Sequence, residues 1–233
     1  MCGRTSLANL PDHLRPFLQR HGVRDVPPWY TPRYNVAPSQ DLMVIVESDG
    51  VRDARRMKWG LVPGWAKDPA IGSRMINARC ETAATKPAYR EAFAKRRGLI
   101  VVDSYYEWRK NPSGAKTPFR IHRADGGPFT IAALWERWGV NDDRMETCAV
   151  ITTEANEVMG RIHHRMPVIV SDEHASDWLS DRSPAEAVRC VIADSDNELE
   201  SVAVSLYVNS PGNDDQRCWE PSPESGTKRS ANA

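Results

Sequence analysis

A cysteine at the second position gives this sequence its most distinctive chemistry. Once Met1 is removed, as is usual before a small side chain, Cys2 carries an α-amine and a thiol on one residue. The amine titrates at about 7.7–8.0 and the thiol at about 8.5, so each has a nucleophilic fraction near neutrality. Such a 1,2-aminothiol condenses with an aldehyde to an imine and closes to a thiazolidine, or it attacks an amide carbonyl with its amine as base. A buried thiol without a reaction is the other interpretation.

Three more polar groups lie in short stretches that can fix them in space. Glu107 follows an apolar strand and two tyrosines and precedes Trp108, so we expect a desolvated carboxyl group that can hold a proton near neutrality, rather than an outward-facing strand end. The neighbours His163 and His164 should point in different directions, so one of them is expected to act as an acid or base, and the residues alone do not decide which. Asn77 can satisfy a buried amine or thiol with its amide, or it can form a turn.

Cations and aromatic rings accompany these groups. Arg4, Arg79 and Arg165 each lie within two residues of a candidate reactive group, and the planar guanidinium suits phosphate oxygens. Trp59, Trp65 and Trp108 offer surfaces on which bases can stack. The proline and two glycines of WGLVPGW (59–65) disfavour a regular core element there, which favours Trp65. Each of these residues, taken singly, is as well explained by a solvated charge or a core aromatic side chain. Together they indicate an anionic substrate beside the reactive centre.

The distribution of charge supports the same kind of partner. The formal net charge is zero, but residues 1–97 carry 17 Lys and Arg against 9 Asp and Glu, a net +8, and residues 171–233 carry 5 against 13, a net −8. A basic front and an acidic back mildly favour a protein that meets nucleic acid. A solvated charged surface is the alternative.

Composition limits the class of protein. The 233 residues are 40% hydrophobic and 27% charged, as expected for one soluble globular domain. The longest apolar runs have the length of a strand, and no cationic start precedes an apolar run, so neither a membrane span nor a signal peptide is expected. Five widely spaced cysteines without a C-x-x-C pair argue for a reducing compartment and against structural zinc. We therefore predict a cytoplasmic protein, associated with the nucleoid when bound to DNA, without metal or cofactor.

The elements that must position these residues are mostly strands. Strands are predicted at 41–48, 99–103, 129–134, 147–153, 167–171 and 201–208, and helices at 9–22, 86–97, 153–163 and 171–181. Pro16 can split the first helix, and the proline-rich stretch 26–40 should form a fixed, extended loop. Because the strands are not separated by regular helices, we predict an α+β fold with a mainly antiparallel, strongly curved or barrel-like sheet flanked by helices. One domain is predicted over residues 1–221, followed by a disordered tail at 222–233.

Several of these stretches together resemble the SOS response-associated peptidase (SRAP) family, also called abasic-site-processing proteins. The stretches are MCGR (1–4), PRYNVAP (32–38), WGLVPGW (59–65), INARCET (76–82), YEW (106–108), HHRMP (163–167, read as H-x-R-M-P) and VNSPGNDD with a later EP (208–221). They occur in the family's order, so the resemblance covers nearly the whole domain. One departure is Ala66, which stands after Trp65 where some members carry a second aromatic residue.

The resemblance implies a reaction and roles for particular residues. It implies that Cys2, after loss of Met1, captures the ring-opened aldehyde of an abasic site in single-stranded DNA as a thiazolidine crosslink, which protects the site from strand cleavage. Asn77 would orient the Cys2 amine or thiol, Glu107 would promote ring opening, and His163 would assist imine chemistry and reversal. The residues that would contact DNA are Arg4, Asn35, Pro38, Trp65, Arg79, Trp108 and Arg165. The family's peptidase label fits cleavage of Met1, and an imine at the lesion also permits weak lyase activity.

Two other functions remain open at this stage. An N-terminal-nucleophile peptidase or amidohydrolase would use Cys2, Glu107 and His163 without DNA, and its activity should be largely insensitive to salt. A noncovalent single-strand binder would retain full function in Cys2→Ser, whereas the capture hypothesis predicts loss of the crosslink with affinity retained. Phosphate-driven binding, in contrast, weakens as salt rises. No obligate protein partner is inferred, and a monomer is expected.

Overall fold

The computed structural model describes residues 2–140, 144–180 and 199–222. The strands are β1 (Thr5–Leu7), β2 (Arg33–Val36), β3 (Asp41–Ser48), β4 (Val51–Trp59), β5 (Asn77–Arg79), β6 (Arg97–Val102), β7 (Ser104–Lys110), β8 (Lys116–Arg123), β9 (Phe129–Trp138), β10 (Met145–Glu154), β11 (Arg165–Pro167), β12 (Ile169–Val170) and β13 (Leu199–Ala203). The helices are α1 (Pro11–Arg20), α2 (Cys80–Ala83), α3 (Arg90–Lys95), α4 (Glu157–Gly160) and α5 (Ala175–Leu179), with 3-10 turns η1 (Pro69–Arg74), η3 (Leu206–Asn209) and η4 (Gln216–Trp219).

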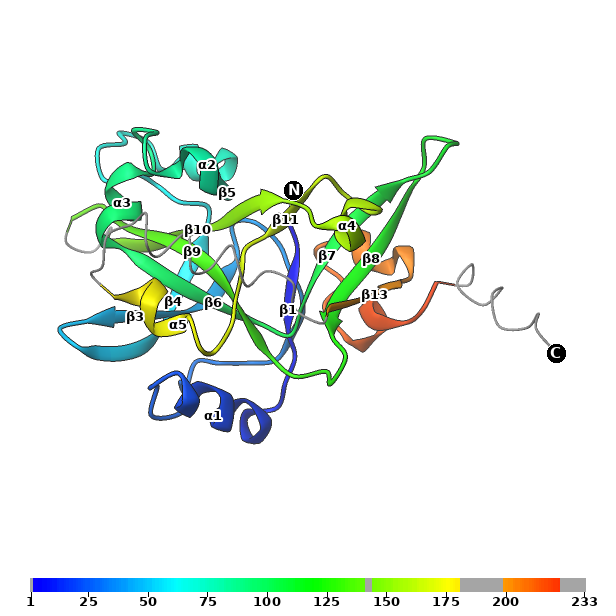
Figure 1. The fold of residues 1–233 in the computed structure, drawn as a ribbon, viewed down its shortest axis with the longest axis horizontal. Helices are drawn as coiled ribbons and strands as arrows, with labels where there is room; N and C mark the ends of the chain where they lie inside the picture. The colour runs from blue at the N-terminus through cyan, green and yellow to red at the C-terminus, as the bar shows by residue number, and fades with distance from the viewer. Residues whose placement is uncertain (1, 141–143, 181–198, 223–233) are drawn as a thin grey trace.

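The larger sheet closes on itself. Its strands follow the order β11-β10-β4-β3-β6-β9-β12, and β10 also pairs with β9, so β4, β3, β6, β9 and β10 form a ring. The closing pair of β10 and β4 is parallel and short, with Thr147 opposite Lys58 and Cys148 opposite Trp59. The remaining ring pairings are antiparallel. Figure 1 shows these strands curling around a common interior. The predicted α+β fold with a curved, barrel-like sheet is confirmed.

A second sheet carries the N-terminal strand. Its order is β13-β8-β7-β1-β2, and all its pairings are antiparallel. β1 lies between β2 and β7, with Thr5 opposite Val36 on one side and Tyr105 on the other. The residues just before β1 are thereby inserted between two segments that are distant in sequence. In Figure 1, β7 and β8 extend together as a long hairpin on the side away from α3.

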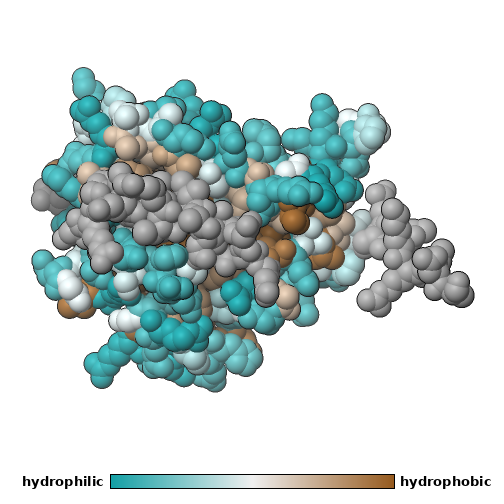
Figure 2. All heavy atoms as spheres, viewed as in Figure 1, coloured by the Kyte–Doolittle hydropathy of each residue, from teal (hydrophilic) through white to brown (hydrophobic). Residues whose placement is uncertain are grey.

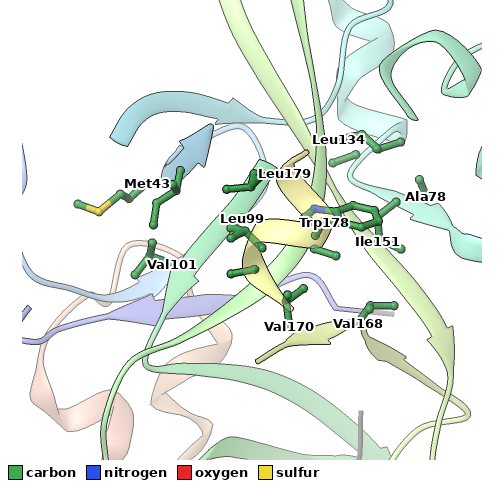
Figure 3. Close-up of a cluster of buried hydrophobic side chains, with 14 of the residues drawn as sticks. Met43, Ala78, Leu99, Val101, Leu134, Ile151, Val168, Val170, Trp178 and Leu179 are labelled. Atoms are coloured by element: carbon green, nitrogen blue, oxygen red, sulfur yellow. The ribbon is translucent and has the colours of Figure 1, made fainter. Parts of the chain in front are cut away.

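Buried apolar side chains fill both sides of the ring of strands. β6 is buried along its whole length, because both of its faces meet protein. One buried cluster contains Leu99, Val101, Leu134 and Trp178, drawn in Figure 3 with α5 packed over the strands. A second cluster contains Cys2 together with side chains of the ring, such as Trp59, and of the smaller sheet, such as Tyr105. Cys2 is therefore part of a packed interior.

Most of the apolar runs form the predicted strands, and the differences have local causes. α1 remains one helix with Pro16 inside it. The stretch 26–40 is held as a loop by the Tyr30 hydroxyl, which donates to the carbonyls of Leu7 and Asn9, and it includes the short strand β2. The predicted strand 201–208 ends at Ala203 and continues as η3. Residues 223–233 of the predicted tail lie outside the described ranges, and Ser222 donates its backbone N–H to Ala203 at 2.9 Å.

The visible surface is mainly hydrophilic. Figure 2 shows polar side chains over most of this face, with smaller apolar patches between them. Among the residues described, no helix combines the length and the apolar composition that crossing a membrane requires.

Candidate active site

Cys2 lies directly before β1 and is fully buried, with 0% exposure. Its neighbours in the buried cluster include Val36, Trp59 and Tyr105, which come from β2, β4 and β7. Burial raises the pKa of the Cys2 thiol, and the negative charge of Glu107 acts in the same direction. The side chain is thus a neutral thiol at neutral pH, and its activation requires a partner that removes the proton or stabilises the anion.

Asn77 holds the backbone of Cys2. It begins β5, which is aligned by parallel pairing with β10, where Val150 lies opposite Asn77. The Asn77 Nδ2 donates to the Cys2 carbonyl oxygen at 2.7 Å, and the Asn77 carbonyl accepts from the Tyr89 hydroxyl at 3.0 Å. The Asn77 Oδ1 is buried and has no hydrogen-bond partner among the described residues. The amide is therefore bound on one side and still able to accept a donor on the other.

Glu107 reaches the same interior from β7. It is 5% exposed and lies opposite Phe119 of β8. Alternate residues of a strand point to the same face, so Glu107 and Tyr105 share one face of β7. The carboxylate is close enough for its charge to oppose ionisation of both the Cys2 thiol and the Tyr105 phenol. The desolvated environment expected for Glu107 is present in the structure.

His163 is fixed by the backbone that follows it. Its Nδ1 lies 3.0 Å from the amide nitrogen and 3.1 Å from the carbonyl oxygen of Arg165, so this nitrogen has a backbone partner in either tautomer. The segment reaches the Cys2 region through Met159 and Met166, which flank it and belong to the same buried cluster as Cys2. The structure thus brings the His163 segment to the Cys2 side of the molecule.

The two histidines do not diverge as the sequence led us to expect. Their ring centroids are 4.3 Å apart with an interplanar angle of 30°. This expectation was wrong because His163 and His164 lie in the irregular connection between α4 and β11, where the alternation of a strand does not apply. The His164 side chain is exposed, and the charge of His163 lowers its pKa, followed by desolvation.

The three predicted phosphate-binding arginines have different surroundings. Arg79 is exposed at the end of β5. Arg165 is buried, donates to both carboxylate oxygens of Glu81 at 2.6 and 3.0 Å, and also donates to the Thr152 carbonyl at 2.6 Å. This pairing lowers the pKa of Glu81. Arg165 would have to exchange or share its carboxylate partner in order to hold a phosphate.

Arg4 and Asn35 meet inside the protein. The Arg4 guanidinium donates from NH1 to the Asn35 Oδ1 and to the Val208 carbonyl, each at 2.7 Å. The Asn35 Nδ2 in turn donates to the carbonyls of Val208, Ser210 and Asn213 at 2.6–3.1 Å. Burial lowers the pKa of Arg4. These contacts attach the 208–213 segment to β1 and β2, which gives this segment a structural role.

The remaining predicted DNA contacts lie at or near the surface. Trp65 is 61% exposed in the loop after β4. Trp108 is half-buried, its Nε1 donates to the Asn209 Oδ1 at 2.8 Å, and the Arg4 guanidinium carbon lies 5.7 Å from the centre of its ring. Pro38 is half-buried between β2 and β3. An exposed indole and a half-buried one thus remain as candidate stacking surfaces.

Sequence reasoning did not single out two residues that shape this site. Glu81 holds Arg165, and it could have been found because it stands in the same INARCET stretch as Asn77 and Arg79. Tyr105 is fully buried and within electrostatic range of Cys2 and Glu107. Strand alternation from Glu107 was the signal that could have identified it.

A match to a protein-family profile identifies the family of the chain. The profile of the SOS response associated peptidase (SRAP) family matches residues 1–211. The chain belongs to the SRAP family. The family predicted from the sequence is therefore confirmed.

SRAP relatives match most of the chain. The chain is 38% identical to the abasic site processing protein YoaM of Bacillus subtilis over an alignment of 218 residues. This alignment covers 91% of this chain and 95% of that protein. The chain is 33% identical to the abasic site processing protein YedK of Escherichia coli, over 77% of this chain and 79% of that protein. It is 30% identical to the abasic site processing protein HMCES of Gallus gallus, over 95% of this chain and 78% of that protein.

Solved structures show the same fold. A crystal structure of a protein from Bacteroides thetaiotaomicron matches with a TM-score of 0.81 and 24% identity, over 95% of this chain and all of that chain. A second, from Bordetella bronchiseptica, matches with a TM-score of 0.74 and 25% identity over 88% of this chain. The SRAP fold is thus shared by proteins of quite different sequence.

Proposed function

We propose that this SRAP protein captures ring-opened abasic sites in single-stranded DNA through Cys2, as a covalent thiazolidine. The observation that carries the proposal is the convergence of the buried Cys2, the carboxyl group of Glu107 and the Asn77 amide, whose Oδ1 is buried without a partner among the described residues. A buried acceptor of this kind is costly unless it gains a donor. The α-amine that loss of Met1 would create on Cys2 is such a donor. Relatives named abasic site processing proteins support the substrate.

The protonation state of Cys2 sets the order of the reaction. Because burial keeps the thiol neutral, the α-amine, with an ordinary pKa of about 7.7–8.0, is the first nucleophile. The amine adds to the aldehyde carbon, and loss of water leaves an imine. The sulfur then adds to the imine carbon, the nitrogen takes the electron pair of the C=N bond, and the thiol proton ends on that nitrogen. One water molecule leaves in the whole sequence.

The neighbouring groups fit the proton transfers of this sequence. Glu107 would take a proton from the sugar hydroxyl and return one to the ring oxygen as the sugar opens, and it would later receive the thiol proton. Asn77 would hold the amine through Oδ1 while its Nδ2 fixes the Cys2 carbonyl. His163, whose ring is oriented by the Arg165 backbone, would serve the dehydration of the imine precursor and its reversal.

Phosphates and bases would be held around this centre. Arg79 is exposed and Trp65 presents its indole to solvent, so both are accessible to a DNA strand without rearrangement. Arg165 would exchange part of its Glu81 contact for a phosphate. Arg4, which lies beside Trp108 and contacts Asn35, would hold a further phosphate. Asn35 and Pro38 would line the path of the DNA strand.

Removal of Met1 and strand cleavage are secondary parts of the proposal. Glu107 and the Cys2 thiol would also serve hydrolysis of the bond before Cys2. Glu107→Gln should then retain Met1 in the purified protein, whereas removal by an aminopeptidase would leave this variant processed. Beta-elimination from the imine would appear as a cleaved strand that accumulates more slowly than the crosslink.

Intact-protein mass spectrometry tests the central proposal. The protein is incubated with a single-stranded oligonucleotide that carries one abasic site, beside the undamaged strand. A species equal to the protein without Met1 plus DNA minus one water is expected, and it should be absent in Cys2→Ser and Cys2→Ala. Noncovalent affinity for the undamaged strand should be retained in both variants. Mature protein without an adduct at any salt concentration would contradict the proposal and favour a peptidase.

Salt dependence tests the arginines. Each phosphate contact that is lost should lower the slope of log affinity against log salt by about 0.7 for a single strand. Arg79→Gln is expected to show this loss, whereas Arg24→Gln, an exposed arginine outside the site, serves as the control. Glu81→Gln frees Arg165 and should tighten binding. Equal slopes in all variants would remove these arginines from the DNA path.

A further inference from the structure

Tyr105 is a buried phenol whose hydroxyl has no hydrogen-bond partner among the described residues. The side chain is 1% exposed and belongs to the same buried cluster as Cys2. Burial places the pKa of its hydroxyl well above the ordinary value, and the charges of Cys2 and Glu107 act in the same direction. Tyr105 therefore keeps its proton throughout the working range of pH and can act only as a donor or as an acceptor without a charge of its own.

The adjacent tyrosine shows what a structural phenol looks like in this strand. Tyr106 is also fully buried, but it faces the other side of β7, and its hydroxyl donates to the Tyr34 carbonyl at 2.7 Å. The two residues share type, burial and strand. They differ in that the hydrogen bond of Tyr106 is made within the fold, whereas the donor of Tyr105 remains uncommitted next to the reactive groups.

The groups that face Tyr105 define what it can bind. Opposite it, β1 presents Thr5 and β8 presents Ile121, neither of which titrates in the working range. The titratable groups that act on it are Cys2, before β1, and Glu107, on β7 itself. Both groups carry negative charge in one of their protonation states. A donor in the same buried cluster as Cys2, and within electrostatic range of both groups, is suited to whichever of the two is ionised.

We propose that Tyr105 is a further catalytic residue for ring closure, and that its hydroxyl donates a hydrogen bond to the Cys2 sulfur as the sulfur loses its proton. The inference rests on the proposed capture reaction. When the sulfur attacks the imine carbon, the S–H bond breaks and the proton passes to Glu107 and then to the nitrogen, which receives the C=N electron pair. Tyr105 keeps its own proton. The hydroxyl thus offsets the burial that otherwise disfavours the thiolate.

Tyr105→Phe removes only the hydroxyl oxygen and tests this role. We expect the rate of thiazolidine formation to fall by about tenfold to a hundredfold, the effect of losing a hydrogen bond to a charged group. Sodium borohydride reduces an imine, which adds two hydrogen atoms, and does not reduce a thiazolidine. Borohydride-trapped adduct should therefore accumulate in the variant at early times, and the alkaline limb of the rate of ring closure should move to higher pH. A purely structural role would shift neither readout.

Tyr106→Phe is the matched control. It breaks a hydrogen bond made within the fold, so its melting temperature should fall by about 2–4 °C while capture remains that of the wild type. Tyr105→Phe removes a group without a partner, so its melting temperature should be unchanged or raised. Tyr106→Phe is thus expected to lower stability without changing capture, and Tyr105→Phe is expected to slow capture without lowering stability.

The possible results are distinguishable. If the wild-type protein forms no adduct, the proposed function fails and ring closure has no meaning. If the wild type forms the adduct and Tyr105→Phe matches it in rate, trapped imine and pH profile, the role of Tyr105 is overturned. If Tyr105→Phe loses both stability and capture, as Tyr106→Phe would not, the hydroxyl is structural and the inference is again wrong.

Discussion

The two ends of β1 are buried to a similar depth but differ in how their polar groups are satisfied. At the Ser6 end, the Asp103 carboxylate accepts from the Ser6 hydroxyl and from the backbone N–H of Ala8, and the Ser104 hydroxyl binds Ser6. Arg120 completes this cluster through a hydrogen bond to the Ser104 hydroxyl at 3.0 Å. At the Cys2 end, the hydroxyls of Thr5 and Tyr105 and the Asn77 Oδ1 are buried without a partner among the described residues.

This difference separates polar groups that are satisfied within the fold from groups that the described residues leave without a hydrogen-bond partner. A buried polar group without a partner costs about 1–3 kcal/mol of stability. Three such groups are therefore a large cost relative to an ordinary free energy of unfolding. The Ser6 end avoids this cost within the fold itself. The Cys2 end recovers it only if a substrate or a new N-terminal amine supplies the missing donors and acceptors. Mutations at the Ser6 end should therefore change stability, and mutations at the Cys2 end should change capture.

The largest expected effect is on stability at the Ser6 end. Asp103→Ala leaves the Ser6 hydroxyl and the Ala8 N–H without their acceptor, so we expect the free energy of unfolding to fall by about 3 kcal/mol. Urea unfolding measures this change, and Asp53→Ala, an exposed carboxylate on β4, should change it by less than about 0.5 kcal/mol. Capture by the folded fraction should remain unchanged. If the Asp103→Ala variant lost capture while it remained folded, the proposed difference between the two ends would be wrong.

The next effect is on capture at the Cys2 end. Asn77→Ala removes the amide that holds the Cys2 carbonyl and offers Oδ1 to the amine, so we expect capture to slow by about tenfold or more. Single-turnover crosslinking to an abasic oligonucleotide measures the rate. Asn77→Asp keeps an acceptor oxygen and should be less impaired than Asn77→Ala. Equal rates in both variants would show that the acceptor has no role.

Two neighbouring residues of β1 sharpen the comparison. Ser6→Ala breaks the bond to Asp103 and should lower the free energy of unfolding by about 1 kcal/mol. Thr5→Val replaces an unpartnered hydroxyl by a methyl group of the same shape, so stability should be equal to that of the wild type or slightly higher. Thermal unfolding of both variants checks this difference. Equal destabilisation would mean that the Thr5 hydroxyl has a partner.

The smallest effect is the pH dependence that Asp103 confers. Burial raises the pKa of Asp103 above its usual value of 3.8, so the folded protein binds this proton more tightly than the unfolded chain does. Its contribution to stability is therefore fully present below pH 3.8 and is lost as the pH rises through the folded pKa. The stability of the wild type relative to Asp103→Asn should decline over this interval in urea unfolding. An increase in this relative stability with pH would show that the pKa of Asp103 is lowered in the folded protein rather than raised.

The strands buried on both faces could be recognised from sequence, and those with charged outer faces could not. β6 and β9 are apolar runs because both of their faces meet protein. β4 has the sequence VRDARRMKW, in which the buried side chains Met57 and Trp59 are apolar and most of the others are charged. β7 and β8 likewise carry charges outward. β4 pairs with its sequence neighbour β3, and β7 pairs with β8, but the pairings of β4 with β10, β7 with β1 and β8 with β13 join segments far apart in the chain. Local patterns do not reveal these distant pairings.

The two tryptophans of WGLVPGW show the same limit at the candidate site. They stand six positions apart, yet Trp59 is fully buried and Trp65 is 61% exposed. The proline and glycines between them indicated an irregular segment, which favoured Trp65 as a surface residue. The sequence gives no comparable signal for Arg4 and Arg165, because their partners, Val208 and Glu81, are brought to them by the fold.

The sequence by itself determined which candidate reactive groups this protein possesses: a thiol at Cys2, a carboxyl group at Glu107, an amide at Asn77 and an imidazole at His163. These depend on residue type and order, which no fold can change. Only the tertiary structure decided that the thiol is neutral, that one arginine is exposed while two are bonded internally, and that the Tyr105 phenol shares a buried cluster with Cys2. Protonation and accessibility depend on burial and on charges that arrive from distant strands, so they are properties of the folded chain.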